Sequence, residues 1–436
     1  MRITSLCLKN VRLFGNEQQI INFDNSKNIT ILLGNNGCGK STILDTASVL
    51  LSPFVGSFPG NSTKNFKESD VHIKSNNTLA DYLQASMTLQ NDGHTFTISR
   101  PRKGLTNAPQ SEIKEIKSYA ESLKKRISDN ESVNLPILAY YGTGRGQIKA
   151  PERKRGFQKV FAQWDCYNTA LEASTDFKRF FAWYDMMEDE ERREREHQRN
   201  FSYTSPILSS VRQAIENFVA PKYKNPHIDI HPLRFVLEEC KGQETRELRL
   251  EQFSDGYKII IAMVADIASR MAEGNPTAEN PLLGSGIILI DEIDLHLHPT
   301  WQRSILRKLH EVFPNVQFIV TTHSPIILSG ASDIAQIITL SEENIIQHSS
   351  NYSDYDISQI LLSDLFGLKS VQSPIFDKDL EDQKKLLEHY QDLSDSELEK
   401  LKLLDKKLSS LSYATSLDDM KMRAYISKLA KKLNIE

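Results

Sequence analysis

The distribution of apolar and polar residues along the chain predicts an α/β fold. Three runs near the start, RITSLCLKNV, QQIINFD and NITILLG, have the apolar and β-branched character of strands. ASMTLQNDGHTFTISR contains two alternating segments around Asn91-Asp92-Gly93, which predicts a β-hairpin. IILIDEID and VQFIVTTHS are apolar without alternation, which is typical of parallel strands that are buried on both faces.

Helical periodicity fills much of the remaining chain. STILDTASVLL, SEIKEIKSYAESLKKRISD, YKIIIAMVADIASRMAE and WQRSILRKLHEVFP are each expected to form a helix. The pattern is helical from about Phe157 to Phe218, and we interpret DMMEDEERREREHQRN there as a solvated helix rich in i,i+4 ion pairs. IDIHPLRFVLEE and RELRLEQFSDG return to strand character, and helices with lysine-rich faces follow Ser350. We therefore predict a mixed or parallel sheet flanked by helices.

A phosphate-binding loop is predicted where the third strand meets the first helix. ILLGNNGCGKST fits the pattern G-x-x-x-x-G-K-[ST], with Gly34, Gly39, Lys40 and Ser41 in the required places. The glycines allow successive N–H groups to form an anion-binding nest, and the positive end of the helix faces the same place. Lys40 would contact the outer phosphates of ATP, and the Ser41 hydroxyl would bind Mg²⁺. The loop residues expected to surround the nucleotide are Asn35, Asn36, Gly37, Cys38, Gly39, Lys40, Ser41 and Thr42.

The segment GIILIDEIDLHLHP supplies the second half of the predicted site. Asp291 and Glu292 come directly after a buried strand, at the edge of an α/β sheet where ligands bind. Asp291 is expected to hold the same Mg²⁺ as Ser41, and Glu292 to orient or deprotonate the attacking water. Two acids at a strand end can also cap a helix, but that interpretation is less favoured beside a phosphate loop.

Two further segments place polar residues at element ends. His323, in VTTHSP, follows another buried strand and could face the γ-phosphate, although a lone histidine is usually structural. FSDGYK places Ser254 and Gly256 at the start of a long helix, where an anion could bind. The same Ser-Asp-Gly stretch is also an ordinary helix cap.

Composition narrows the class of protein. The 436 residues are 39% hydrophobic and 25% charged, which is ordinary for a globular protein, and the net charge of −4 gives no global basic field for nucleic acid. Four cysteines without metal-ligand spacing favour a reducing compartment, and Cys38 is interpreted as a tolerated small residue rather than a redox switch. No segment has the length and apolarity of a membrane span or a signal peptide, so we expect a cytoplasmic protein.

The order of these motifs resembles that of ABC-type ATPase heads, particularly the SMC, RecF and OLD group. The resemblance implies that Ser254-Asp255-Gly256 is the signature motif, Asp291 and Glu292 the Walker B pair, and His323 the switch histidine. It further implies that the signature of one subunit closes over ATP held by another, in a homodimer or a higher even-numbered oligomer. NVRLFG resembles the group's N-terminal segment, from which Arg12 would reach toward the nucleotide. Gln147 is the candidate glutamine-loop ligand of Mg²⁺, with Arg145 as its companion.

A narrower resemblance extends over nearly the whole chain. ILAYYGTGR, the short charged insertion, FSDGYKIIIAMVADIASRM and GIILIDEIDLHLHPTWQ are together similar to the PtuA-type ATPases of Septu and certain retron anti-phage defence systems. Membership would imply an ATPase that controls an HNH nuclease partner, PtuB. In retron versions a reverse transcriptase and its DNA–RNA product would join. His296 and His298 lack a third metal ligand in the sequence and are assigned a structural or dimer-contact role.

This resemblance gives the expected division of the chain. We predict a first ATPase lobe with the phosphate loop and hairpin at 1–150, and a helical insertion or second lobe at 151–245. Residues 246–345 would hold the signature, Walker B and switch-histidine part of the core, and residues 346–436 a helical region for partner docking or oligomerisation.

Alternative functions remain open at this point. No Toprim-like set of acids and no zinc cluster of an HNH fold is found in the sequence, so any cleavage would come from a partner. The lysine-rich tail could be a solvated face, a docking surface or a nucleic-acid contact. The main alternative is a RecF- or SMC-like ATPase that acts directly on DNA in repair. A transporter ATPase is the least favoured alternative, because the insertion and the His-Leu-His-Pro stretch do not resemble a transporter head.

Overall fold

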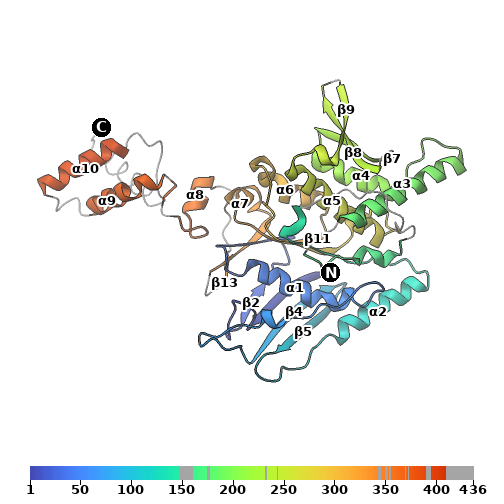
Figure 1. The fold of residues 1–436 in the computed structure, drawn as a ribbon, viewed down its shortest axis with the longest axis horizontal. Coiled ribbons are helices and arrows are strands. Elements are labelled where there is room, and N and C mark those ends of the chain that lie inside the picture. Colours follow the sequence, from blue (N-terminus) through green and yellow to red (C-terminus); the bar gives the residue numbers. More distant parts are fainter. Residues whose placement is uncertain are drawn as a thin grey trace. The chain divides into compact units, whose positions relative to one another are not determined.

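The computed structural model divides the chain into two compact units, Met1–Asn351 and Tyr352–Glu436. Each unit is described by itself (Figure 1). The residues that the structure describes are 1–146, 161–173, 177–230, 233–242, 244–341, 345–348, 352, 355–368, 370–371, 373–388 and 394–408.

A six-stranded sheet forms the centre of the first unit. Its strands lie in the order β13-β12-β3-β11-β10-β6, and only β13 runs antiparallel to its neighbour. The residues of β6, β10 and β11 are all buried, which confirms the prediction of parallel strands covered on both faces. Their carboxyl ends therefore meet at one edge of the sheet. The strands are β13 Ile345–His348, β12 Ala335–Leu340, β3 Ile29–Gly34, β11 Val316–Thr321, β10 Gly286–Ile290 and β6 Ile137–Tyr141.

A second, antiparallel sheet comprises β2 (Gln19–Asn22), β1 (Arg2–Lys9), β4 (Tyr82–Asn91) and β5 (His94–Lys103), in that order. The predicted hairpin is confirmed, because β4 and β5 pair across a two-residue turn in which Asp92 and Gly93 both have positive φ. In Figure 1 this sheet lies at the bottom of the unit.

Helix α1 (Lys40–Val55) lies between the two sheets. It contacts β3, β10 and β11 on one side and β4 and β5 on the other, so most of its residues are buried. Helix α2 (Lys114–Ser128) packs against α1 and β5. Because α1 begins directly after the predicted phosphate loop, its burial fixes the position of that loop.

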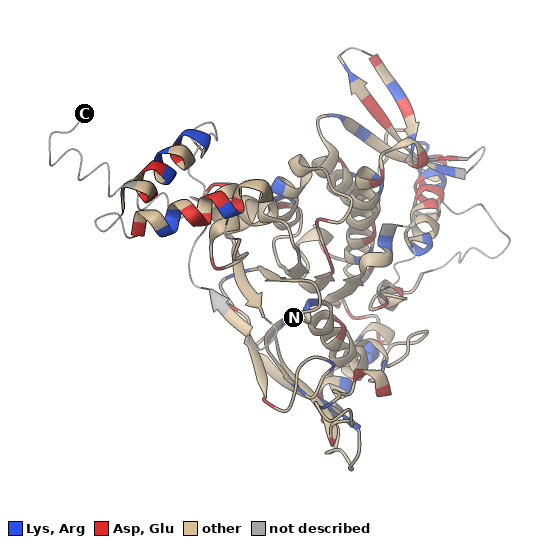
Figure 2. Ribbon diagram, turned by 60° about the vertical axis from the view of Figure 1, so that its left-hand side comes forward, with Lys and Arg blue, Asp and Glu red and all other residues tan. Residues whose placement is uncertain are grey.

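The rest of the first unit is built on helix α5 (Asp255–Gly274), which packs against β6. A third sheet, β7-β8-β9, projects at the top of Figure 1, and the paired strands β8 and β9 carry both signs of charge (Figure 2). The further elements are α3 Lys178–Gln198, α4 Pro206–Val219, α6 Pro299–Val312, α7 Pro325–Ala331, β7 Tyr223–Ile230, β8 Leu233–Lys241 and β9 Glu244–Arg249. Short 3-10 turns are η1 Glu68–Asp70, η2 Thr143–Gly146, η3 Gln163–Tyr167, η4 Leu250–Gln252 and η5 Pro281–Leu283.

The charged helix α3 differs from the prediction of a solvated helix. Glu188 and Glu191 are buried, and Arg212 of α4 donates hydrogen bonds to both carboxylates. Burial raises the pKa of Glu188, while its bonds to Arg212 and to the Ile228 backbone oppose the shift. The i,i+4 pair of Arg195 with Glu191 does form. The charge run is thus partly a helix–helix interface, which its sequence did not distinguish from a solvent-facing surface.

The second unit contains α8 (Ile357–Leu362), η6 (Pro374–Phe376), α9 (Asp377–Glu388) and α10 (Asp395–Leu408). Helices α9 and α10 contact each other, and Lys400 pairs with Asp382 across them at 2.8 Å. Both helices carry acidic and basic residues (Figure 2) rather than one sign of charge.

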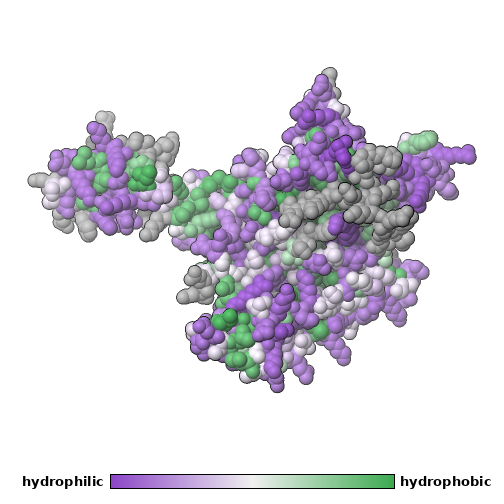
Figure 3. Space-filling model, in the orientation of Figure 1, coloured by the Kyte–Doolittle hydropathy of each residue, from purple (hydrophilic) through white to green (hydrophobic). Residues whose placement is uncertain are grey.

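The polarity of the surface and the state of the cysteines are those of an ordinary globular protein. The face of the molecule in Figure 3 is mainly hydrophilic. Among the described residues, no helix combines the length and the apolarity that crossing a membrane would require. All four cysteines are free thiols, as predicted.

Candidate nucleotide-binding site

The loop between β3 and α1 has the backbone shape that its glycines predict. Gly39 caps α1 with φ 98°, in the left-handed region that favours glycine. A side chain there would also collide with Phe14, because an ideal Cβ on Gly39 would lie 2.8 Å from the Phe14 ring. Gly37 has φ 86°. Residues Asn35 to Gly39 thus form a tight turn that only a glycine-rich sequence can follow, directly before the positive end of α1.

Lys40, the first residue of α1, extends back across this loop. Its ammonium donates to the carbonyl oxygens of Gly34 at 2.8 Å and Asn35 at 2.9 Å. Burial lowers the pKa of Lys40, while Cys38, Asp291 and Glu292 oppose the shift. The ammonium also lies 3.9 Å from the Cys38 sulfur, and a phosphate group would be a stronger partner for the cation than these carbonyls or the sulfur.

Ser41 and Asp291 are brought together from positions 250 residues apart. The Ser41 hydroxyl donates to Asp291 Oδ2 at 2.8 Å, and Asp291 Oδ1 accepts from the Thr321 hydroxyl at 2.6 Å. Asp291 is only 5% exposed to solvent, whereas Ser41 is exposed. A carboxylate and a hydroxyl side by side are oxygen ligands of the kind that Mg²⁺ prefers, so this pair fits the predicted cation.

Glu292 follows Asp291 in an unusual backbone conformation. Its φ is 47°, in the left-handed region, so it does not continue the extended backbone of β10. Its N–H donates to the Thr321 hydroxyl at 2.6 Å, and its carbonyl accepts from Arg145. The backbone of Glu292 is therefore held from both sides of β10, by Thr321 at the end of β11 and by Arg145 in the η2 turn that follows β6.

His323 lies two residues beyond the end of β11 and is partly buried. Burial and the Lys40 ammonium lower the pKa of the imidazole, while Asp294, Glu292 and Asp291 oppose the shift. At neutral pH the ring is therefore uncharged, with one N–H able to donate a hydrogen bond.

Arg12 forms ion pairs with two acidic residues. Its guanidinium pairs with Asp45 at 2.7 Å and Asp70 at 2.9 Å, and Asp45 also accepts from the Tyr140 hydroxyl at 2.9 Å. Asp45 is on α1, so Arg12 is tied to the helix that begins with Lys40. Gln147, the predicted Mg²⁺ ligand, lies outside the described residues.

Ser254 is the N-cap of α5 and is exposed, and its side chain makes no capping hydrogen bond. The N-terminal N–H groups of the helix therefore have no side-chain partner at the cap. An ideal Cβ on Gly256 would lie 2.7 Å from the His296 carbonyl oxygen, which explains glycine at that position. The start of α5 thus packs against the segment that follows Glu292.

The chain is similar to known proteins over most of its length. The family described as "AAA domain, putative AbiEii toxin, Type IV TA system" matches residues 29–329. The Retron Vc95 probable ATPase of Vibrio cholerae serotype O1 biovar El Tor is 30% identical over 379 residues, which is 74% of this chain and 71% of that protein. The Septu protein PtuA of Bacillus mycoides strain KBAB4 is 36% identical over 167 residues, or 37% of this chain and 22% of that protein. The chain belongs to this AAA family, together with the retron ATPases.

Two solved structures are loosely similar to this ATPase. A crystal structure of an SMC head bound to the C-terminal winged-helix domain of ScpA has a TM-score of 0.49 at 17% identity, covering 81% of this chain and 99% of that one. The SMC head domain from Thermotoga maritima has a TM-score of 0.41 at 18% identity, covering 80% of this chain and all of that one. The predicted PtuA-type family is confirmed by the retron and Septu relatives. The predicted α/β ATPase-head fold is confirmed by the central parallel sheet, with the phosphate loop after β3 and Asp291 after β10.

The sequence did not predict the contacts that two residues make with Asp291 and Glu292. Thr321 joins Asp291 to the backbone of Glu292, and Arg145 bonds to the carbonyl oxygens of both. Thr321 could have been identified from the sequence, because it is the last residue of the buried strand β11, which lies beside β10. Arg145 was named only as a companion of Gln147, and its own role required the fold.

The paired histidines after Glu292 have a structural role in part. His298 is the N-cap of α6, and its ring accepts a hydrogen bond from the Thr300 N–H. Within the described ranges, no group of three or more potential ligands could hold a metal ion through histidine, cysteine or acidic side chains. His296 has φ 64°, so it forms part of the turn that contacts Gly256.

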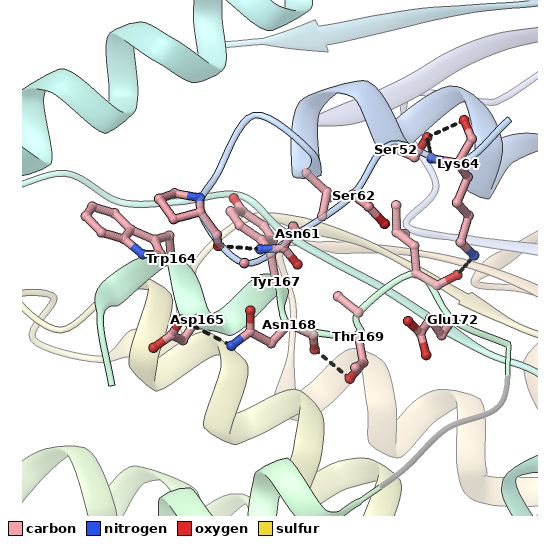
Figure 4. A pocket seen from close by; sticks show the side chains of 15 residues that line it. Ser52, Asn61, Ser62, Lys64, Trp164, Asp165, Tyr167, Asn168, Thr169 and Glu172 are labelled. Atoms are coloured by element: carbon pink, nitrogen blue, oxygen red, sulfur yellow. Dashed lines mark hydrogen bonds between the residues drawn. The ribbon is translucent and has the colours of Figure 1, made fainter. Parts of the chain in front are cut away.

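A cavity of about 480 Å³ lies away from the residues described so far (Figure 4). Its wall combines Asn61 and Lys64, from the segment after α1, with Trp164 and Asn168 around η3. Ser52 also lines it, and Ser52 is about 18 Å from Lys40 along the α1 axis, at 1.5 Å per residue. None of the predicted site residues lines this cavity, so it is distinct from the candidate nucleotide site.

Replacing Thr321 by valine should impair the site while preserving its volume. Thr321→Val removes one hydroxyl that is hydrogen-bonded to both Asp291 and Glu292. We expect the ATP turnover number to fall by about tenfold, on the order of the net value of one to two lost hydrogen bonds. Steady-state phosphate release measures this. Thr339→Val, on β12 of the same sheet, is the control and should change turnover by less than twofold.

Proposed function

We propose that this ATPase binds Mg·ATP where Lys40, Ser41 and Asp291 converge, and that Glu292 activates the attacking water. Lys40 would neutralise the outer phosphates, while Ser41 and Asp291 would supply oxygen ligands for Mg²⁺. When bound, Mg²⁺ would offset the negative charge that develops on the phosphates. Glu292 would orient the water and accept its proton, and the neutral His323 would donate a hydrogen bond near the γ-phosphate.

One observation carries the proposal of a shared nucleotide and Mg²⁺ site. The hydroxyl after the phosphate-loop lysine and the first acid of the Walker B strand are 2.8 Å apart. Ser41 lies in the first turn of α1, which follows β3, and Asp291 follows β10, so the two side chains come from distant segments whose strands are separated by β11. The fold therefore supports the combination that a Mg²⁺-dependent hydrolase requires.

We further propose that two heads close over two nucleotides and that this state controls an HNH nuclease partner. The exposed N-terminus of α5 supports a dimer, because its cap residue Ser254 and the adjacent N–H groups could bind the γ-phosphate of a nucleotide held by a second copy. The names of the retron and Septu relatives support a place in such a defence complex. In retron versions, a reverse transcriptase and its DNA–RNA product would complete the assembly.

Ser254→Arg tests the closure of two heads while leaving every residue of the phosphate-binding loop in place. A bulky cation at the helix start should leave Mg·ATP binding to each monomer within about threefold, but should prevent nucleotide-dependent dimers. Analytical ultracentrifugation with and without Mg·ATP, in a Glu292→Gln background, gives the readout. Ser202 is exposed in the loop between α3 and α4. The variant Ser202→Arg is the matched control, and this protein should dimerise normally. Dimers of Ser254→Arg at wild-type affinity would contradict the role of α5 in trans.

The partner is tested by affinity purification from the native host. Copurification of a small HNH nuclease, with its activity dependent on the nucleotide state, is the expected result. Salt-sensitive DNA binding by the isolated protein, strengthened by ATP and without a nuclease partner, would instead favour the RecF-like alternative.

A further inference from the structure

Arg145 is the most deeply buried arginine near the candidate site. It is 1% exposed and lies in η2, just after the carboxyl end of β6. Its guanidinium donates to three backbone carbonyl oxygens, those of Gly142, Asp291 and Glu292. Among the described residues, it forms no ion pair within 4.0 Å.

Burying a guanidinium without a carboxylate partner costs free energy, which points to a specific role for Arg145. Burial disfavours the charged form of arginine, and elsewhere in this protein the buried Arg270 is paired directly with the Asp266 carboxylate at 2.8 Å. Arg145 instead uses its planar fork to bond to two consecutive carbonyls, which a lysine could not span in the same way. The carbonyls belong to Asp291 and Glu292, the two acids of the candidate site.

The second observation is the backbone of Glu292. A φ of 47° is disfavoured for a glutamate and persists only where the surroundings enforce it. The N–H side of this residue is held by Thr321, and the carbonyl side by Arg145. The next residue, Ile293, is also tied to β11, because its N–H donates to the Thr321 carbonyl at 2.9 Å.

We propose that Arg145 is a positioning residue for Glu292. By bonding to the carbonyls of the two peptide groups that flank the Glu292 Cα, it fixes the left-handed backbone that sets where the Glu292 carboxylate lies. This inference rests on the proposed role of Glu292 in hydrolysis. It predicts an effect on the chemical step and not on nucleotide binding, since Arg145 is buried and, among the described residues, donates only to main-chain carbonyls.

The test is a double-mutant cycle between Arg145 and Glu292. Arg145→Met and Arg145→Lys are each made in the wild-type chain and in Glu292→Gln, and single-turnover hydrolysis of radiolabelled ATP is measured. In the wild-type chain we expect about 30-fold slower hydrolysis for Arg145→Met and about tenfold for Arg145→Lys, with the KM for ATP within threefold. In Glu292→Gln we expect a further loss of less than twofold, because residues that act as a unit are not additive.

A matched control separates positioning from stability. Arg100 is also a buried arginine that donates to neutral acceptors, the Val49 carbonyl at 3.1 Å and the Ser52 hydroxyl at 3.3 Å. Arg100→Lys should lower the thermal midpoint as Arg145→Lys does, but should change hydrolysis by less than threefold. Any loss it causes should appear equally in both backgrounds.

The outcomes are distinguishable. An equal fractional loss from Arg145→Met in both backgrounds would overturn the inference, because a general structural defect behaves in that way. Wild-type hydrolysis by Glu292→Gln would instead remove the proposed role of Glu292 itself. If Arg145→Met fails to fold, Arg145→Lys, which keeps the buried charge, decides the comparison.

Discussion

Glu292→Gln is expected to lower the ATP turnover number by about 10²–10³-fold while Mg·ATP binding stays within a few-fold of wild type. General-base catalysis typically contributes about 10²–10⁴-fold, and an amide of the same shape cannot accept the proton. The Ser41–Asp291 contact does not involve the Glu292 side chain, so the cation ligands remain in place. Phosphate release measures turnover, and isothermal calorimetry measures binding.

The same variant should accumulate closed dimers when Mg·ATP is present. If hydrolysis opens the dimer, a protein that binds but does not hydrolyse remains closed, and sedimentation would show the larger species. Glu279→Gln, at an exposed acid in the loop after α5, is the control and should behave as wild type in both assays. Normal turnover by Glu292→Gln would exclude this residue as the base.

The parallel core could be predicted because its signals are local. Residues 286–290 are apolar throughout and residues 316–320 are apolar except for Gln317, and polar residues follow each run, so both the strands and their functional ends could be identified. The glycine spacing of the phosphate loop is likewise local, since Gly37 and Gly39 adopt the positive φ that their motif requires. These features depend on the residue types within one short segment.

The supporting contacts could not be predicted, because each joins distant segments through one hydrogen bond. Arg145 precedes Asp291 by 146 residues, and no pattern in GTGRG indicates that its fork bonds to carbonyls of the Walker B turn. The pairing of Arg12 with Asp45 and Asp70 likewise depends on the position of α1. Partner choice among many possible carboxylates is set by packing, which a single sequence does not contain.

The middle of α5 is linked to the edge of the central sheet at which Asp291 lies. Tyr141, the last residue of β6, donates through its hydroxyl to Asp266 of α5 at 2.8 Å, and its carbonyl accepts from the Asp291 N–H at 2.8 Å. Arg270 also bonds to Asp266, so this contact is fully buried and paired. Tyr141 therefore connects a buried ion pair of α5 to the backbone of Asp291.

Lys40→Ala is expected to weaken Mg·ATP binding by at least about 10²-fold. A charge-assisted hydrogen bond to phosphate from a partly buried ammonium is stronger than one in solvent, and alanine leaves the phosphates facing the loop without a compensating cation. Calorimetry or a fluorescent ATP analogue measures the dissociation constant. Lys117→Ala, which removes an exposed ammonium from α2, is the control and should bind as wild type does.

The pH dependence of binding gives an independent test of the same residue. Burial lowers the pKa of Lys40, so as the pH rises its positive charge is lost at a lower pH than that of an ordinary lysine. ATP affinity should therefore decline on the alkaline side earlier than for an ordinary lysine. Lys40→Arg keeps its charge across that range, so any binding that it retains should lack the alkaline decline. An identical decline in wild type and Lys40→Arg would show that a different group titrates, and Lys40 would then not be the cation that holds the phosphates.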